Sequence, residues 1–280
     1  MIKKSSITFF LIVLFLGLGC EKEDDFNIRN LNHNIIMILG HGGMGDMYKY
    51  PNNSMEAILP VIGIGADGSE IDIQLTKDSV LILYHDEKLD SRTSCSGFAY
   101  EHQWLEIQNC LYSTLIGQVQ VISVEQLFNS IPNVNELYFS FDCKLSSDLY
   151  YDNEYRKSYL RAIKRTCEKY DMHDNVFIEG DMDFLLKAKS LGLSNKGVVI
   201  GSTVDDAVEN NIFAIGTTLD TPFEEIEYAH KKGVYVMMWG AKTDFGNKKA
   251  IELNPDFLQT DKPIPILMLF NRFNYDYRIP

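Results

Sequence analysis

Short apolar runs alternate along this chain with longer stretches in which apolar residues recur at helical spacing. The short runs predict extended segments at 35–39, 68–75, 80–84, 136–141, 176–179, 197–200, 212–217, 234–239 and 257–260. The longer stretches predict helices at 54–64, 124–130, 155–170, 183–191, 205–210, 222–232 and 247–253. A repeated strand–helix order is typical of parallel strands joined by crossover helices.

This order leaves two architectures within the α/β class. We expect a TIM-type (β/α)8 barrel, and the alternative is an open doubly wound sheet. No GxGxxG or GxxxxGK[ST] phosphate loop follows the first strand, which disfavours the open sheet. The extended segments outnumber the eight strands of a closed barrel, so one is expected to be accessory or wrongly assigned. Residues 86–120 lack the strand–helix rhythm, and we interpret them as a small insertion after the strand that ends at His85.

The N-terminus has the layout of an export signal. Lys3 and Lys4 precede an apolar stretch at 7–18 that is short for a transmembrane helix, and Cys20 after it resembles the lipid-bearing cysteine of a bacterial lipobox. We therefore expect a signal peptide at 1–19, a lipid-anchored acidic tether at 20–34 and a barrel domain at 35–280. The alternative is an uncleaved N-terminal anchor. Both place the protein in the cell envelope, exported and held at a membrane such as the outer membrane or the cell surface.

Charge and cysteine content limit the kinds of binding partner and of metal site that we expect. The net charge of −13 disfavours nucleic acid and anionic lipid as docked partners, because both are negatively charged. Apart from Cys20, the cysteines show no CxxC or zinc-type spacing. Cys95 and Cys110 flank a loop-like stretch, and the sequence leaves open whether they are bridged. Cys143 and Cys167 are expected to be buried thiols in a strand and a helix. The oligomeric state is not indicated.

Ionisable residues gather where the first predicted strands end. In a barrel, the carboxyl ends of the strands meet at one face, where catalytic side chains lie. The residues at or near these ends are His41, Glu70, Asp72, His85, Asp142 and Lys144. Residues two apart on a strand share a face, and inward carboxylates are costly to bury unless a cation neutralises them. Oxygen ligands favour Ca²⁺ or Mg²⁺, and two histidines beside such an ion could act as acid and base.

Each of these residues has a purely structural alternative. A single histidine at a strand end is commonly hydrogen-bonded within a loop, and a single acid commonly caps the next helix. For Glu179, binding substrate and capping the helix that follows are both open. The joint occurrence of two histidines, three acids and a lysine at neighbouring strand ends is what indicates a catalytic site.

Several segments together resemble the bacterial glycerophosphodiester phosphodiesterase family, here as a lipoprotein-type member. In order, they are GHGGMG, PNNSMEA, GADGSEIDIQLTKDSVLILYHDEKLD, FDCK, VYVMMWG and PDFLQTDKP. The resemblance spans roughly residues 36–263 and is most specific over 65–90. It implies a TIM-type barrel that hydrolyses glycerophosphodiesters, its small-molecule substrates, to glycerol 3-phosphate and an alcohol.

The resemblance also implies a role for each site residue. The implied positions are His41 and His85 for the acid–base pair, Glu70, Asp72 and Asp142 for a divalent metal ion (Ca²⁺ or Mg²⁺), and Lys144 and Trp239 for substrate binding. Neither the sequence nor the resemblance says which histidine is the acid and which the base.

Three positions depart from the family pattern. Gly42 stands where the family has an arginine that grips the phosphate, Asn52 replaces a glutamate, and Asp142 replaces a longer glutamate. Losing a charge-assisted phosphate contact leaves substrate choice open. The alternatives are a phospholipase-type enzyme acting on lysophospholipid or sphingomyelin-like substrates, and a non-catalytic envelope barrel that binds phosphodiesters or glycans.

Overall fold

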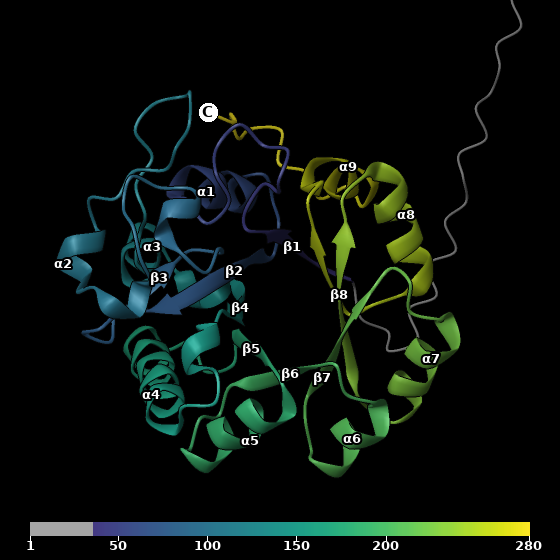
Figure 1. The fold of residues 1–280 in the computed structure, drawn as a ribbon. Helices are drawn as coiled ribbons and strands as arrows, with labels where there is room; N and C mark the ends of the chain where they lie inside the picture. The colour runs from purple at the N-terminus through teal and green to yellow at the C-terminus, as the bar shows by residue number, and fades with distance from the viewer. Residues whose placement is uncertain (1–35) are drawn as a thin grey trace, which may run out of the picture.

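The strands close into a parallel barrel. The computed structural model describes residues 36–280, so the predicted signal peptide and the whole of the predicted tether, including Cys20, lie outside the described residues. The ring runs in the order β1, β2, β4, β5, β6, β7, β8 and β9, and β9 pairs with β1 (Figure 1). The strands are β1 Met37–His41, β2 Gly68–Leu75, β4 Tyr138–Cys143, β5 Val176–Gly180, β6 Lys196–Ile200, β7 Ala214–Thr218, β8 Tyr235–Ala241 and β9 Phe257–Thr260. The predicted TIM-type barrel is confirmed.

Helices surround the ring (Figure 1). The predicted helical segments correspond to α1 Met55–Gly63, α3 Val124–Ser130, α4 Asn153–Tyr170, α5 Met182–Ser190, α6 Val204–Glu209, α7 Phe223–Lys231 and α8 Asp244–Leu253. The sequence pattern missed two more, α2 Trp104–Ile107 and α9 Pro263–Leu269. The first is a single turn, and the second carries two prolines, which usually argue against a helix. Within residues 36–280, no helix combines the length and the apolarity needed to cross a bilayer.

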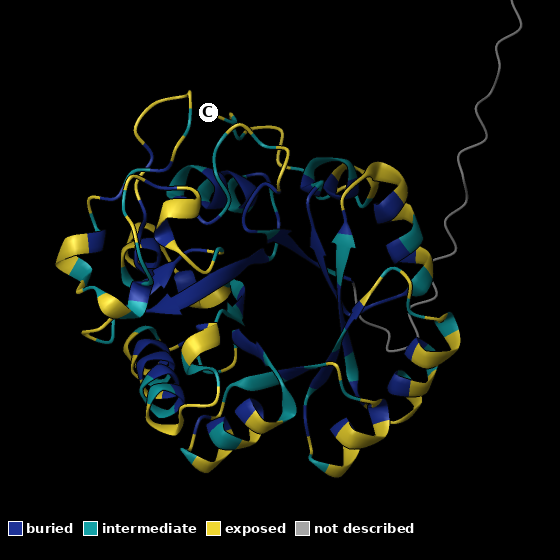
Figure 2. Cartoon of the chain, viewed as in Figure 1, coloured by how far each residue is buried: buried dark blue, intermediate teal, exposed yellow. Residues whose placement is uncertain are grey.

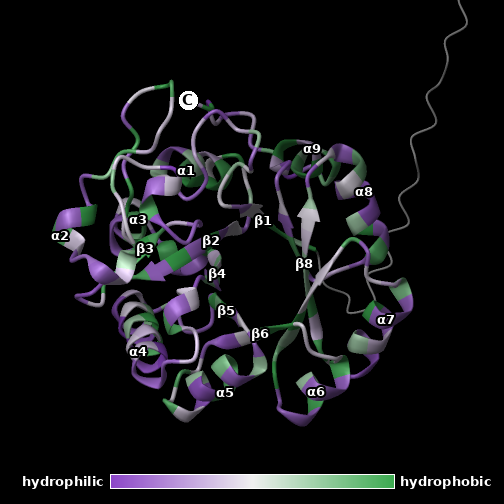
Figure 3. Ribbon diagram, viewed as in Figure 1, coloured by the Kyte–Doolittle hydropathy of each residue, from purple (hydrophilic) through white to green (hydrophobic). Residues whose placement is uncertain are grey.

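Burial is deepest along the strands (Figure 2). Residues of the strands and of the surrounding helices form the main apolar cluster, and hydrophobic residues occur on both kinds of element in Figure 3. All positions of β2 are buried. Its Ile71 and Ile73 belong to the main apolar core, whereas Glu70 and Asp72 alternate with them and so occupy the other face. The pleat of one strand therefore carries ionisable groups into the barrel interior, where they need partners.

The remaining strand, β3 Leu81–Leu83, lies outside the ring and runs antiparallel to β2. The sequence analysis placed His85 at the carboxyl end of a parallel strand, and this was wrong. Leu83 pairs with Ile73, and the Tyr84 N–H donates to the Asp72 carbonyl at 3.0 Å. The chain thus returns along β2 as a hairpin and brings His85 beside the carboxylates from the opposite direction.

Residues 86–120 pack over β3 as short elements, including the 3₁₀ turns η1 Leu89–Ser91 and η2 Ala99–Glu101 and the helix α2. Their buried side chains form an apolar cluster of their own with Ile82 and Tyr84. A disulfide joins Cys95 to Cys110, which resolves the pairing that the sequence left open. The disulfide therefore closes the insertion on itself, and packing against Ile82 and Tyr84 holds it on the barrel.

We expect the Cys95→Ser/Cys110→Ser variant to lose stability. The bond closes a loop with a sequence separation of 15, for which chain entropy predicts a contribution of about 3 kcal/mol. Denaturant unfolding of the oxidised wild type and of the variant measures the difference. Cys167→Ser, which removes a buried free thiol, is the matched control. An unchanged unfolding midpoint in the double variant would show that packing alone holds the insertion.

Candidate active site

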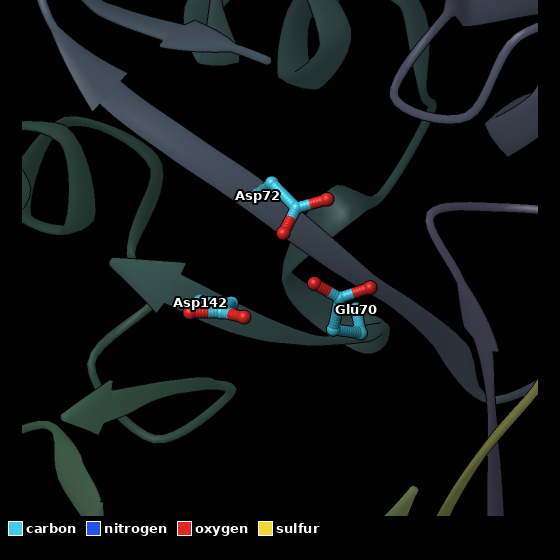
Figure 4. A group of neighbouring side chains, drawn as sticks. All are labelled: Glu70, Asp72 and Asp142. Atoms are coloured by element: carbon cyan, nitrogen blue, oxygen red, sulfur yellow. The ribbon is translucent and has the colours of Figure 1, made fainter. Parts of the chain in front are cut away.

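Three carboxylates from two adjacent strands gather inside the carboxyl end of the barrel (Figure 4). Glu70 and Asp72 lie on β2, and Asp142 lies on β4 in register with Asp72. One oxygen of each falls within 4.8 Å of the others. Since the register of the parallel pair sets this proximity, the sheet itself assembles the cluster predicted from the sequence.

The charges of this cluster call for a cation. Glu70 is 1% exposed and Asp72 is 4% exposed. Burial and the charge of Asp72 raise the pKa of Glu70 well above its usual value, although the charge of His41 partly opposes this. Glu70 Oε1 is buried and has no hydrogen-bond partner among the described residues. An unpartnered buried carboxylate oxygen beside two other carboxylates fits a hard divalent cation.

Neighbouring groups orient two of these carboxylates. The Asn53 side chain donates from Nδ2 to Asp72 Oδ2 at 2.6 Å and accepts the Asp72 N–H at 2.9 Å. Asn53 has φ 65°, a left-handed conformation that asparagine tolerates better than most residues. The Gly42 N–H donates to Glu70 Oε2 at 2.8 Å. The loop after β1 therefore holds both acids of β2 in fixed orientations.

Lys144 forms ion pairs with two of the three acids. Its Nζ lies 3.0 Å from Asp72 Oδ1 and 2.5 Å from Asp142 Oδ2. Burial alone lowers the pKa of Lys144, but the charges of these two aspartates outweigh it and raise that pKa above its usual value. The ammonium group thus compensates carboxylate charge in the barrel interior.

His41 ends β1 and faces the carboxylates. Its Nδ1 donates to Asp261 Oδ1 at 2.7 Å, and its Nε2 lies 3.9 Å from Glu70 Oε2. Burial lowers the pKa of His41, but the hydrogen bond to Asp261 and the charge of Glu70 raise it to about 10. Asp261 thereby fixes the ring and leaves Nε2 as the reactive nitrogen.

This shift predicts the titration of the metal-free protein. Because the folded-state pKa of about 10 exceeds the ordinary value of 6.5, ionisation of His41 stabilises the fold fully below pH 6.5, and the stabilisation disappears as the pH rises through 10. NMR titration of the ring should show His41 protonated at pH 8. Asp261→Asn should lower its pKa, and a His41 ring that titrates near pH 6.5 in the wild type would contradict the geometry.

His85 follows β3 and is more exposed. Its Nδ1 donates to Asp86 Oδ1 at 2.8 Å, and the other oxygen of Asp86 accepts from Arg92 Nε at 3.0 Å. As with His41, a carboxylate holds Nδ1 and leaves Nε2 available.

The two histidines open onto one cleft of about 230 Å³. Its lining residues are His41, Asp46, Pro51, Asn52, Asn53, Asp72, Tyr84, His85, Asp86, Arg92, Tyr112 and Lys242. Glu70, Asp142 and Lys144 adjoin it through their contacts with His41 or Asp72. The arrangement can therefore present two imidazoles and an acidic cation site to one small molecule.

Trp239 was expected to bind substrate. It is on β8, partly buried, and its ring lies against Gly216 of β7. It is not among the described residues that line the cleft. Its role in substrate binding stays a prediction.

The structure decides what Glu179 contacts. Glu179 does not cap α5, because Asp181 does so by accepting the Phe184 N–H at 2.7 Å. Glu179 Oε1 instead accepts from Ser140 Oγ at 2.6 Å and from Gln259 Nε2 at 2.5 Å inside the barrel. The capping alternative is therefore wrong.

Sequence reasoning missed two partners of the site. Asp261 holds His41, and Asn53 holds Asp72. Asp261 directly follows β9, so the rule that placed the other acids at strand ends would also have found it. Asn53 follows β1 by a dozen residues, and although the PNNSMEA segment of the family resemblance contains it, the sequence assigned it no role.

Comparison with known proteins agrees with this fold and indicates a family. The model of the glycerophosphoryl diester phosphodiesterase family matches residues 41–264. A glycerophosphodiester phosphodiesterase of Bacillus altitudinis is 28% identical over 135 residues, 46% of this chain and 52% of the relative, so the alignment spans about half of that protein.

Two solved structures share the fold. A glycerophosphodiester phosphodiesterase from Parabacteroides distasonis superposes with a TM-score of 0.71 at 18% identity, covering 85% of this chain and 98% of the other. A phosphodiesterase of Oleispira antarctica, in complex with the product sn-glycerol-3-phosphate, superposes with a TM-score of 0.72 at 14% identity, covering 84% of this chain and 96% of the other.

Proposed function

Since the chain belongs to the glycerophosphoryl diester phosphodiesterase family, we propose that it hydrolyses glycerophosphodiesters to glycerol 3-phosphate and an alcohol. The observation that carries this proposal is that His41 and His85 line one cleft beside the carboxylate cluster. The structural neighbour that holds sn-glycerol-3-phosphate supports the proposed product.

The donor set of Glu70, Asp72 and Asp142 would hold Ca²⁺ or Mg²⁺. Such an ion supplies Lewis-acid polarisation of the phosphoryl oxygens when it is bound. The chain's own contribution is to hold three carboxylates from two strands in a fixed geometry, in which Lys144 and Asn53 both contact Asp72.

The histidines move the protons. One takes a proton at Nε2 from the attacking hydroxyl, and the other donates a proton from Nε2 to the oxygen of the leaving alcohol as its bond to phosphorus breaks. Asp261 and Asp86 hold the opposite nitrogens of the two rings and so orient both Nε2 atoms. A water molecule supplies the attacking oxygen and gives glycerol 3-phosphate directly, or the substrate's neighbouring glycerol hydroxyl does so and gives a cyclic phosphate. In the second case water then opens the cyclic phosphate to glycerol 3-phosphate, with the two histidines exchanging their roles.

The test is turnover of glycerophosphocholine by the full chain in detergent. We expect release of glycerol 3-phosphate that requires added Ca²⁺ or Mg²⁺. No turnover across several head groups would refute the proposed activity.

A second candidate is cleavage of lysophospholipids. It is favoured by exposed apolar side chains on loops at the carboxyl face of the barrel, where Met47 is 77% and Tyr151 is 87% exposed. Choline release, which both glycerophosphocholine and lysophosphatidylcholine give on cleavage, separates the two candidates, because a higher kcat/KM for lysophosphatidylcholine would support the second.

We also propose that the protein is exported and anchored through a lipid on Cys20, on the strength of the sequence pattern at 1–20. Cys20→Ser should move the protein from the membrane fraction to the soluble fraction. Membrane retention of this variant would favour the uncleaved anchor.

A further inference from the structure

The cleft that receives an anionic substrate has an acidic base. Glu70, Asp72 and Asp142 gather there, and the ammonium group of Lys144 already contacts two of them. A phosphodiester is itself negatively charged, so its recognition needs cations that these acids do not neutralise. The described residues that line the cleft include one arginine, Arg92, and one lysine, Lys242.

Position 42, next to His41, cannot supply such a cation. Gly42 has φ +60°, and a Cβ there would lie 2.7 Å from Asn52 Cβ and 2.9 Å from Asn52 Cγ. Asn52 is held in place because its Nδ2 donates to Asp46 Oδ1 at 2.6 Å. Both the backbone conformation and the space above it exclude a long side chain at this point.

Hydrogen bonds to both the N–H and the carbonyl of Arg92 hold its backbone in place. Its N–H donates to Tyr84 Oη at 3.2 Å, and its carbonyl accepts the Ser113 N–H at 2.7 Å. The Cys95–Cys110 disulfide ties the same segment three residues further on. The insertion is thus built to hold Arg92 at the cleft.

The side chain of Arg92 retains donors for a ligand. Its Nε donates to Asp86, and the side chain is 57% exposed. The guanidinium carries further N–H donors on its two terminal nitrogens, in a geometry that suits phosphate oxygens.

Lys242 approaches the cleft from the other side of β1. It follows β8, and its Nζ lies 3.6 Å from Asp46 Oδ2 with the side chain 65% exposed. In the barrel, β9 and β8 lie on one side of β1, whereas β2 and the insertion behind it lie on the other. Arg92 and Lys242 therefore flank the His41 strand.

We propose that Arg92 and Lys242 bind the phosphate of the substrate from two sides of the cleft, with Arg92 as the main contact. This inference rests on the proposed function, since it names the residues that recognise the substrate's phosphate at that same site. The insertion at 86–120 then has a function, which is to bring a cation to a cleft whose other charges are mostly acidic.

The test is calorimetric binding of glycerol 3-phosphate to the full chain in detergent, with Mg²⁺ or Ca²⁺ present. Arg92→Ala should weaken binding roughly ten- to a hundred-fold, the range of a lost charge-assisted contact. Arg92→Lys should restore part of the affinity, and Lys242→Ala should weaken binding roughly ten-fold. Arg161→Ala, on the exposed outer face of α4, is the matched control. Affinity of Arg92→Ala within two-fold of the wild type would overturn the proposal, as would a wild type that does not bind glycerol 3-phosphate.

Arg92 also contacts Asp86, which holds His85, so an indirect role of Arg92 through His85 must be distinguished from direct phosphate binding. Product binding requires no proton transfer, so an indirect role would lower kcat and shift the pH profile while leaving the affinity for glycerol 3-phosphate intact. That outcome would make Arg92 a positioning residue and refute the phosphate contact. If the wild type turns over no diester but binds glycerol 3-phosphate through Arg92, the proposed activity fails and the phosphate contact stands.

Discussion

Replacing His41 by alanine is expected to lower kcat for glycerophosphocholine by roughly 10²–10⁴-fold, the range for loss of a general acid or base. His41 is the imidazole nearest to the carboxylate cluster, with Nε2 3.9 Å from Glu70 and Nδ1 held by Asp261. No other described side chain is placed to replace it, since His85 reaches the cleft from the insertion side. The variant also removes a positive charge beside Glu70, so its fold must be checked by circular dichroism.

Two further variants test the prediction for His41. Asp261→Asn keeps the His41 ring but weakens its support, and we expect a smaller loss of kcat with an altered pH profile. His173→Ala, in the turn before β5, is the control and should retain full activity. Turnover by His41→Ala close to that of the wild type would remove this residue from the mechanism.

Chelation is the second change expected to have a large effect. Exhaustive treatment with a chelator should abolish turnover, and added Ca²⁺ or Mg²⁺ should restore it, because the three acids at the cleft base lack sufficient compensating charge without an ion. Binding should also stabilise the fold by about 2.7 kcal/mol when the metal exceeds its Kd a hundred-fold. Thermal unfolding with and without metal measures this independently of activity.

The Asp72→Asn variant tests whether the metal ion binds at the carboxylate cluster. The amide keeps the shape of Asp72 but removes the charge that faces Lys144 and lies beside Glu70 and Asp142. We expect the variant to lose both the metal-dependent rise in Tm and the activity, whereas Asp174→Asn, in the turn before β5, should keep both. A full metal response in Asp72→Asn would place the ion elsewhere, and undiminished activity after chelation would remove the metal from the mechanism.

Local patterns predicted most of the barrel because they report local backbone conformation. The strand and helix segments follow from apolar periodicity, and the shared face of Glu70 and Asp72 follows from the two-residue period of a strand. The antiparallel direction of β3 could not be predicted from these local patterns. Residues 80–84 look like any other buried strand, and only pairing with β2 makes them antiparallel.

The sequence by itself determined the barrel class, the two carboxylates of β2 and the histidines that belong with them. Only the tertiary structure decided their partners. Asp261 reaches His41 across 220 residues because β9 closes the ring against β1. Arg92 and Lys242 share a cleft because a disulfide-bonded insertion and the end of β8 converge on it. Contacts of this kind depend on closure of the ring and on packing of the insertion, and neither leaves a periodic signal in the chain.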